Sequence, residues 1–93
     1  MKHLFLFLGL LCVGLSDVSN DLFEAGNDAM IYEKYEDAVQ AYESLLDIGQ
    51  AHADIYYNLG NAYYRLHYLG QSIWAYTNGL KLSPRDRDAL HNL

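Results

Sequence analysis

Apolar residues recur along most of the chain with the spacing of α-helices. In the stretch YYNLGNAYYRLH (residues 56–67), Tyr56, Leu59, Gly60 and Tyr63 follow the i, i+3, i+4, i+7 pattern of one helix face. The same pattern predicts helices near 20–32, 36–48, 53–66 and 70–82, with a fifth beginning near residue 87. Pro84 disfavours a helical conformation in the preceding residue, so it is expected to end the fourth helix. The pattern therefore predicts an all-α fold.

The chain also repeats itself after 34 residues without a gap. This shift superposes identical residues: Gly26 and Gly60, Asn27 and Asn61, Tyr42 and Tyr76, Leu46 and Leu80, Asp54 and Asp88, Asn58 and Asn92, and Leu59 and Leu93. A helix-turn-helix unit recurring at this interval is typical of solenoids, in which neighbouring units stack to bury a continuous core.

The repeat resembles the tetratricopeptide repeat family, whose interval is 34 residues. Counted from Ala53, the second repeat carries Tyr56, Leu59, Gly60, Tyr63, Tyr76 and Pro84 at motif positions of that family. The first repeat, counted from Ser19, is looser, and Gln50 replaces its closing proline. The resemblance implies an α-α superhelix made of repeat 19–52, repeat 53–86 and the start of a truncated third repeat at 87–93.

The resemblance also implies two sets of functional positions. The structural core of the repeats would comprise Gly26, Ala38, Tyr42, Tyr56, Leu59, Gly60, Tyr63, Tyr76 and Pro84. A concave groove that binds a protein or peptide partner would be lined by Phe23, Asn27, Met30, Asp54, Tyr57, Asn61, Tyr64, Arg65, Asp88 and His91. Tyrosine suits such a surface because a rigid ring with a polar tip loses little entropy on binding.

The asparagines of the groove have two possible roles. Asn27 and Asn61 can exchange hydrogen bonds with the backbone of a bound peptide, or they can bond to neighbouring helices within the repeats. One specialised subtype of the family clamps a C-terminal carboxylate with basic side chains. Here Phe23, Asp88 and Asn92 occupy the positions of those bases, so we do not expect this chain to bind a terminal carboxylate.

The charge of the chain argues against one class of partner and says little more about function. The net charge of −6 and a pI near 4.8 argue against a nucleic-acid surface, which needs a basic face. Repeat 19–52 holds eight acidic residues and one lysine, whereas repeat 53–86 has a net charge of +1. A solvated helix face explains this asymmetry most simply, and steering of a basic partner is the alternative.

The sequence contains little that indicates catalysis. His52, His67 and His91 have no metal-ligand spacing, and no glycine-rich phosphate loop is present. We therefore predict a binding protein that needs no metal or cofactor.

The first sixteen residues have the layout of a signal peptide. A short basic start is followed by twelve apolar or glycine residues (4–15), and small residues precede a cleavage point before Asp17. Twelve residues are too few to span a bilayer comfortably. An N-terminal core helix and a lipoprotein anchored through Cys12 are the less favoured alternatives. The protein is therefore expected to be exported, to the periplasm or the periplasmic face of the inner membrane, with membrane contact only through an uncleaved signal peptide.

The runs YYNLGNAYY (56–64) and LSPRDRDALHNL (82–93) narrow the resemblance further. Together with the secreted start, they look like the BatE-type tetratricopeptide proteins of bacterial aerotolerance operons. That resemblance implies a scaffold that works with membrane-anchored von Willebrand A-type proteins and a MoxR-type ATPase. His67, Ser72 and Gly79 depart from the common residues of the repeats.

Three further expectations complete the sequence-based picture. The third repeat stops after seven residues, so the chain is expected either to be part of a longer protein or to dimerise through its open C-terminal end. A generic periplasmic adaptor for envelope assembly or secretion is a second possible function. An accessory module of an enzyme whose catalytic part lies beyond residue 93 is a third.

Overall fold

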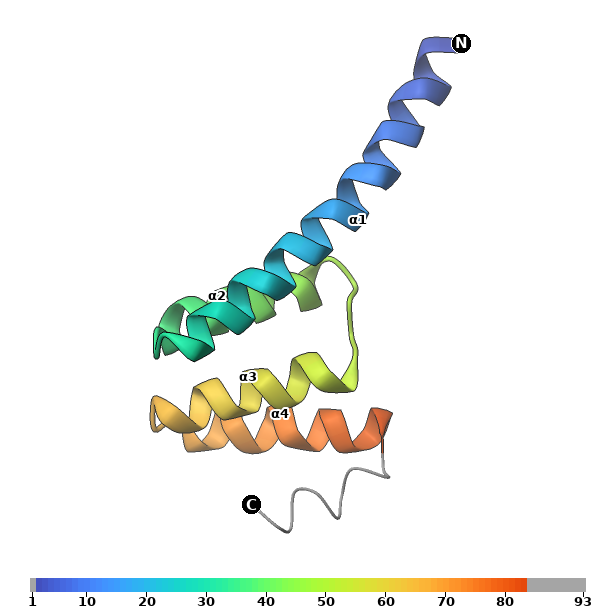
Figure 1. Cartoon of the computed structure of the whole chain (residues 1–93). Coiled ribbons are helices and arrows are strands. Elements are labelled where there is room, and N and C mark those ends of the chain that lie inside the picture. The colour runs from blue at the N-terminus through green and yellow to red at the C-terminus, as the bar shows by residue number, and fades with distance from the viewer. Residues whose placement is uncertain (1, 84–93) are drawn as a thin grey trace.

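The computed structural model describes the backbone of residues 2–83 and the side chains of residues 17–83 (Figure 1). It contains four helices: α1 (Lys2–Ile31), α2 (Tyr35–Asp47), α3 (Ala53–Arg65) and α4 (Leu69–Leu82). The predicted all-α helical repeat is confirmed, and seven of the eight helix ends lie within one residue of the predicted ends. The predicted fifth helix lies outside the described residues.

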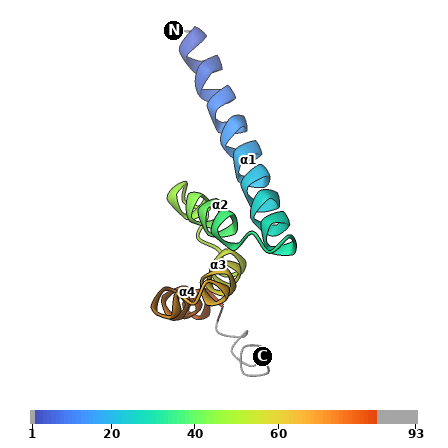
Figure 2. The ribbon, with the colours of Figure 1, turned by 90° about the vertical axis from the view of Figure 1, so that its left-hand side faces the viewer.

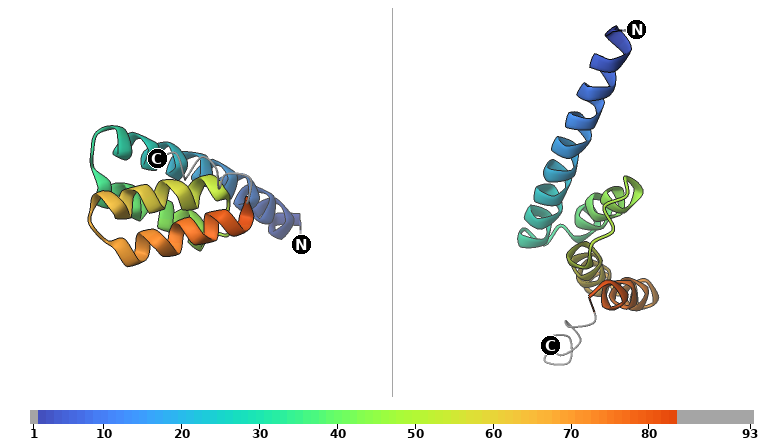
Figure 3. Two further views of the ribbon diagram at one scale, coloured as in Figure 1. Left: turned by 90° about the horizontal axis from the view of Figure 1, so that it is seen from below. Right: turned by 90° about the vertical axis from the view of Figure 1, so that its right-hand side faces the viewer.

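The start of α1 is the one helix end that differs from the prediction. The helix begins at Lys2 rather than near residue 20, because no proline interrupts the chain between the apolar segment and the first repeat. The N-terminal half of α1 extends beyond the other three helices (Figures 1 and 3). The assignment of residues 1–16 as a signal peptide stays a prediction.

The helices form two antiparallel pairs, α1 with α2 and α3 with α4, and α2 packs against α3 to join the pairs. Figure 2 shows α3 and α4 nearly end-on, with α1 running at an angle beside α2. Each helix thus contacts the next one along the chain, which is the arrangement expected of stacked helix-turn-helix units.

Helices α1, α2 and α3 end in the same hydrogen-bonded motif. The residues that follow these helices adopt a left-handed conformation, with φ of 59° at Glu33, 88° at Gly49 and 65° at His67. After α1, the Lys34 N–H donates to the Ala29 carbonyl at 2.8 Å, as in a Schellman motif. Glu33 and His67 therefore stand where glycine is favoured, and the backbone of each is strained by roughly 1 kcal/mol.

The centre of the core joins both helix pairs. The side chains of Tyr42, Leu45 and Leu59 are at most 1% exposed, and Ala38, Ala62 and Ala75 are fully buried around them. Tyr63 is 7% exposed, whereas Tyr56 is half-buried and packs edge-on against Trp74 with ring centroids 5.8 Å apart. Pro84 lies outside the described residues.

Two glycines set the spacing between the helices of each pair. A Cβ added to Gly26 would lie 2.6 Å from Cε1 of Tyr42, and one added to Gly60 would lie 2.7 Å from Cδ1 of Tyr76. In both pairs the tyrosine ring therefore rests directly on the backbone of the partner helix. This shared contact explains why glycine and tyrosine recur together after 34 residues.

We predict that Gly60→Ala lowers the free energy of unfolding by about 1–2 kcal/mol. The added methyl group must displace the Tyr76 ring, a clash that outweighs the roughly 1 kcal/mol by which alanine favours a helix over glycine. Gly70→Ala is the matched control, because a Cβ there meets nothing within 4 Å. It should leave stability unchanged or raise it by up to about 1 kcal/mol. Urea unfolding of both variants tests this, and equal shifts would contradict it.

Candidate partner-binding groove

The predicted groove residues on described positions come from α1 and α3. Asp54, Tyr64 and Arg65 are exposed, with 59% of the Tyr64 side chain accessible. The half-buried members of the set are Phe23, Asn27, Met30, Tyr57 and Asn61. Asp88 and His91 lie outside the described residues.

Asn27 and Asn61 each link the two helices of their own repeat. The Tyr42 hydroxyl donates to Asn27 Oδ1 at 2.6 Å, and the Tyr76 hydroxyl donates to Asn61 Oδ1 in the same way. Each tyrosine therefore lies on a glycine and is fastened to the asparagine that follows it. The oxygens of both side chains thus have a structural role, while each side chain also carries two N–H donors that can face a ligand.

Tyr57 is held against α4. Its ring lies on the backbone at Gly79, where an added Cβ would overlap the ring, and its hydroxyl donates to the Ser83 carbonyl at 3.2 Å. This hydrogen bond gives a donor to the carbonyl of Ser83, the residue that caps the end of α4. The sequence signal for this close contact is Gly79, a glycine within the predicted helix 70–82.

Arg65 reaches toward the turn between α1 and α2. Its Nε donates to the Tyr35 hydroxyl at 3.0 Å, and its Cζ lies 5.2 Å from the centre of the Tyr35 ring. The arginine therefore fastens the end of α3 to the start of α2. A cation this close to an aromatic ring adds roughly 0.5–1 kcal/mol at an exposed site.

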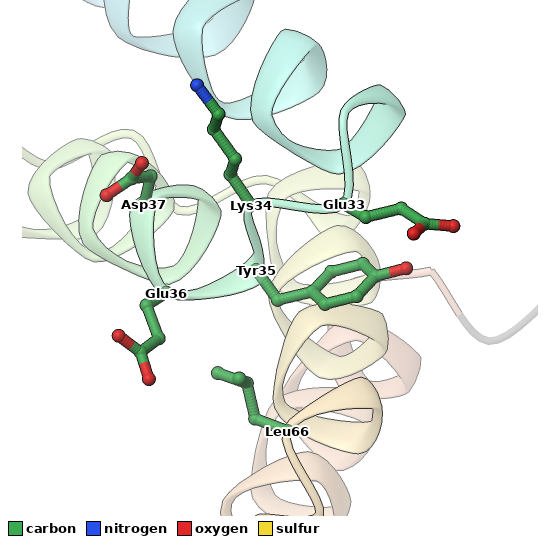
Figure 4. A pocket seen from close by; sticks show the side chains of 6 residues that line it. All are labelled: Glu33, Lys34, Tyr35, Glu36, Asp37 and Leu66. Atoms are coloured by element: carbon green, nitrogen blue, oxygen red, sulfur yellow. The ribbon is translucent and has the colours of Figure 1, made fainter.

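The cavity beside this turn has a volume of about 350 Å³ (Figure 4). Its lining consists of Glu33, Lys34, Tyr35, Glu36, Asp37 and Leu66. Figure 4 shows the three carboxylates pointing in different directions rather than toward one point. No cluster of residues in the described part of the chain is suited to hold a metal ion.

A second cavity, of about 250 Å³, lies between α1, the end of α2 and the start of α3. The apolar side chains of Phe23, Leu45 and Ile55 line it, with Leu45 and Ile55 at most 3% exposed. Polar residues complete the lining: Ser19, Asn20, Gln50, His52 and Asp54. The cavity brings together the predicted groove residues Phe23 and Asp54. Sequence reasoning missed the contribution of the connection between α2 and α3, because that segment carries no repeat signal.

A polar contact between α2 and α3 joins the two repeats. The buried Tyr63 of α3 donates a hydrogen bond to the Glu43 carboxylate of α2. Burial, together with the hydrogen bond and charge of Glu43, raises the pKa of the Tyr63 hydroxyl above its usual value. The tyrosine therefore stays neutral and continues to donate at physiological pH.

The geometry defines a helical-repeat protein in which α1 packs against α2, α2 against α3 and α3 against α4. A family model described as TPR repeat matches residues 26–66, and with the fold it supports assignment to the tetratricopeptide repeat family. Repeats of this family generally mediate protein–protein interaction. Comparison with curated proteins gave no significant match. Within residues 17–83, whose side chains the structure describes, no helix has the length and apolar character needed to cross a membrane.

We predict that the contribution of Tyr42 to stability is lost at alkaline pH. Burial raises the pKa of Tyr42 from 10.0 to about 12, so the fold favours the neutral hydroxyl. Below pH 10, Tyr42→Phe should cost about 1 kcal/mol through loss of the hydrogen bond to Asn27. Between pH 10 and 12 the unfolded state releases the proton more readily, so the advantage of the native chain should shrink.

Urea unfolding of both chains across this pH range measures the difference in free energy directly. Tyr32→Phe is the matched control, because Tyr32 is 73% exposed. Its difference from the native chain should stay near zero at every pH. A pH-independent cost of Tyr42→Phe would contradict the predicted linkage.

Proposed function

We propose that the protein is an exported, non-catalytic scaffold that binds an extended segment of a partner protein along the face formed by α1 and α3. The observation that carries this proposal is the 250 Å³ cavity, which opens between helices already fixed by the core. Asp54 and Tyr64, two predicted groove residues of α3, are both exposed, so a polar and an aromatic side chain are available to a partner. The general role of tetratricopeptide repeats in protein interaction supports this function.

The rigidity of the frame favours binding without a large entropy cost. The Tyr42–Asn27 and Tyr76–Asn61 hydrogen bonds fix each helix pair, and the Tyr63–Glu43 bond fixes one pair on the other. A surface that is ordered before the partner arrives loses less conformational freedom on binding. Only the partner segment then has to become ordered.

The finer part of the proposal is a role in a bacterial aerotolerance complex with von Willebrand A-type membrane proteins. Its support is the resemblance of the runs at 56–64 and 82–93 to BatE-type proteins. A general periplasmic adaptor for envelope assembly, or an accessory module of a larger enzyme, would use the same binding face. The identity of the captured partner separates these possibilities.

Site-specific photo-crosslinking in cells tests the binding face. A photoreactive phenylalanine analogue at position 64 should crosslink to a partner, because Tyr64 is a predicted groove residue and is 59% exposed. The same probe at position 32 is the control, because Tyr32 is more exposed but is not one of the groove residues. We expect a von Willebrand A-type protein in the adduct from position 64. Crosslinking to a different partner would contradict the proposed role in aerotolerance. Equal adducts from both positions, or no adduct from either, would contradict partner binding along the groove.

A reporter fusion tests export separately. Residues 1–18 fused to alkaline phosphatase, which is active only outside the bacterial cytoplasm, should give phosphatase activity. Leu8→Arg should abolish that activity, because a charge in the apolar segment prevents insertion into the export pathway. Lys2→Ala, which leaves the apolar run intact, should reduce the activity only slightly. Equal activity of the native and Leu8→Arg fusions would exclude a signal peptide.

A further inference from the structure

The cavity between α1, α2 and α3 has the size of one side chain. Drug-sized ligands usually occupy pockets of roughly 300–1,000 Å³, and this cavity measures about 250 Å³. Phe23, Leu45 and Ile55 supply an apolar lining, and the polar residues of the lining come from α1, the α2–α3 connection and α3. Such a site favours an apolar side chain whose backbone stays at the polar edge.

The charged residues near this cavity are acidic. Asp54 is part of the lining, and Asp17 lies within one helical turn of the lining residue Asn20. Residues 17–33 contain no lysine or arginine, and the same is true of residues 35–64. The cavity is therefore adjacent to negative charge that no neighbouring base along these segments neutralises.

Of the three lysine and arginine side chains that the structure describes, Arg65 and Lys34 are at the opposite end of the helices from the cavity. Arg65 follows Asp54 by eleven residues, which corresponds to about 16 Å along α3. That distance exceeds the screening length of about 8 Å at physiological ionic strength. Arg65 is also engaged with Tyr35, and Lys34 follows the other end of α1. Lys81 is in the last turn of α4, at the same end as the start of α3, but α4 does not line the cavity.

We propose that the cavity receives an apolar side chain of a partner segment that carries lysine or arginine within two residues of it. This inference rests on the proposed function, because it names the chemistry of the segment that the groove binds. In an extended chain, residues two apart lie about 7 Å from each other on the same side, a spacing that lets a base reach Asp54 while its neighbour fills the cavity. The apolar side chain provides most of the affinity, and the base provides selectivity.

Screening of a random octapeptide array with the full-length chain tests the inference. We expect the bound peptides to be enriched in a large aliphatic or aromatic residue with lysine or arginine within two positions. For the best such peptide, Asp54→Asn should weaken binding about five-fold, as expected for loss of one exposed ion pair. Asp54→Lys should weaken it further and remove the preference for basic peptides.

Asp37→Lys is the matched control for the charge reversal. Asp37 is an exposed acid in the first turn of α2, as Asp54 is in the first turn of α3, so both changes disturb their helix dipoles similarly. Asp37 does not line this cavity, and its replacement should change peptide affinity less than two-fold. Equal losses from Asp37→Lys and Asp54→Lys would show a general effect of net charge and overturn the inference.

The composition of the bound peptides separates this inference from the proposed function. Enrichment of acidic peptides, or of apolar peptides without a nearby base, would overturn the inference while leaving peptide binding by the groove intact. Absence of any enriched peptide would count against both. Binding of basic peptides that is insensitive to Asp54→Lys would place them elsewhere on the surface and would also overturn the inference.

Discussion

The structure depends on the contact between a tyrosine ring and a glycine backbone within each helix pair. Tyr42 rests on Gly26 and Tyr76 rests on Gly60, at a separation that excludes even one additional carbon. The hydroxyl of each ring then donates to the asparagine beside that glycine. Packing sets how closely the two helices approach, and the hydrogen bond sets how they are rotated about their axes. The face that α1 and α3 present to a partner follows from both.

The two ends of the helical stack differ in chemistry. In α3, the side chains of Ile55 and Ala62 are at most 3% exposed. Their equivalents one repeat earlier are Asp21 and Asp28, both exposed on α1. Stacking a further repeat on that side would bury two carboxylates without partners, so α1 closes the stack there. On α4, by contrast, Ile73 is 67% exposed although its equivalent in α2, Val39, packs against the core.

The sequence predicted the helices well because their apolar periodicity and their 34-residue repeat give the same boundaries. It did not predict that the apolar N-terminal segment would continue into α1, since no local signal marks either a join or a break. The roles of Asn27 and Asn61 stayed open because each depends on a tyrosine fifteen residues away. The cavity was missed for a similar reason: its lining comes from three helices and a connection, which only the packed structure brings together.

Departures from the repeat explain where the candidate site lies. In the second repeat, the Tyr57 ring packs on Gly79, and its hydroxyl donates a hydrogen bond to the Ser83 carbonyl at the end of α4. The ring therefore lies in close contact with α4. The equivalent residues in the first repeat are Phe23 and Leu45, which have no such hydroxyl and no such glycine. The ring there cannot lie on the α2 backbone as closely, and space remains between Phe23, Leu45 and Ile55. Identical positions in the two repeats thus maintain the frame, and the positions at which the repeats differ create the site.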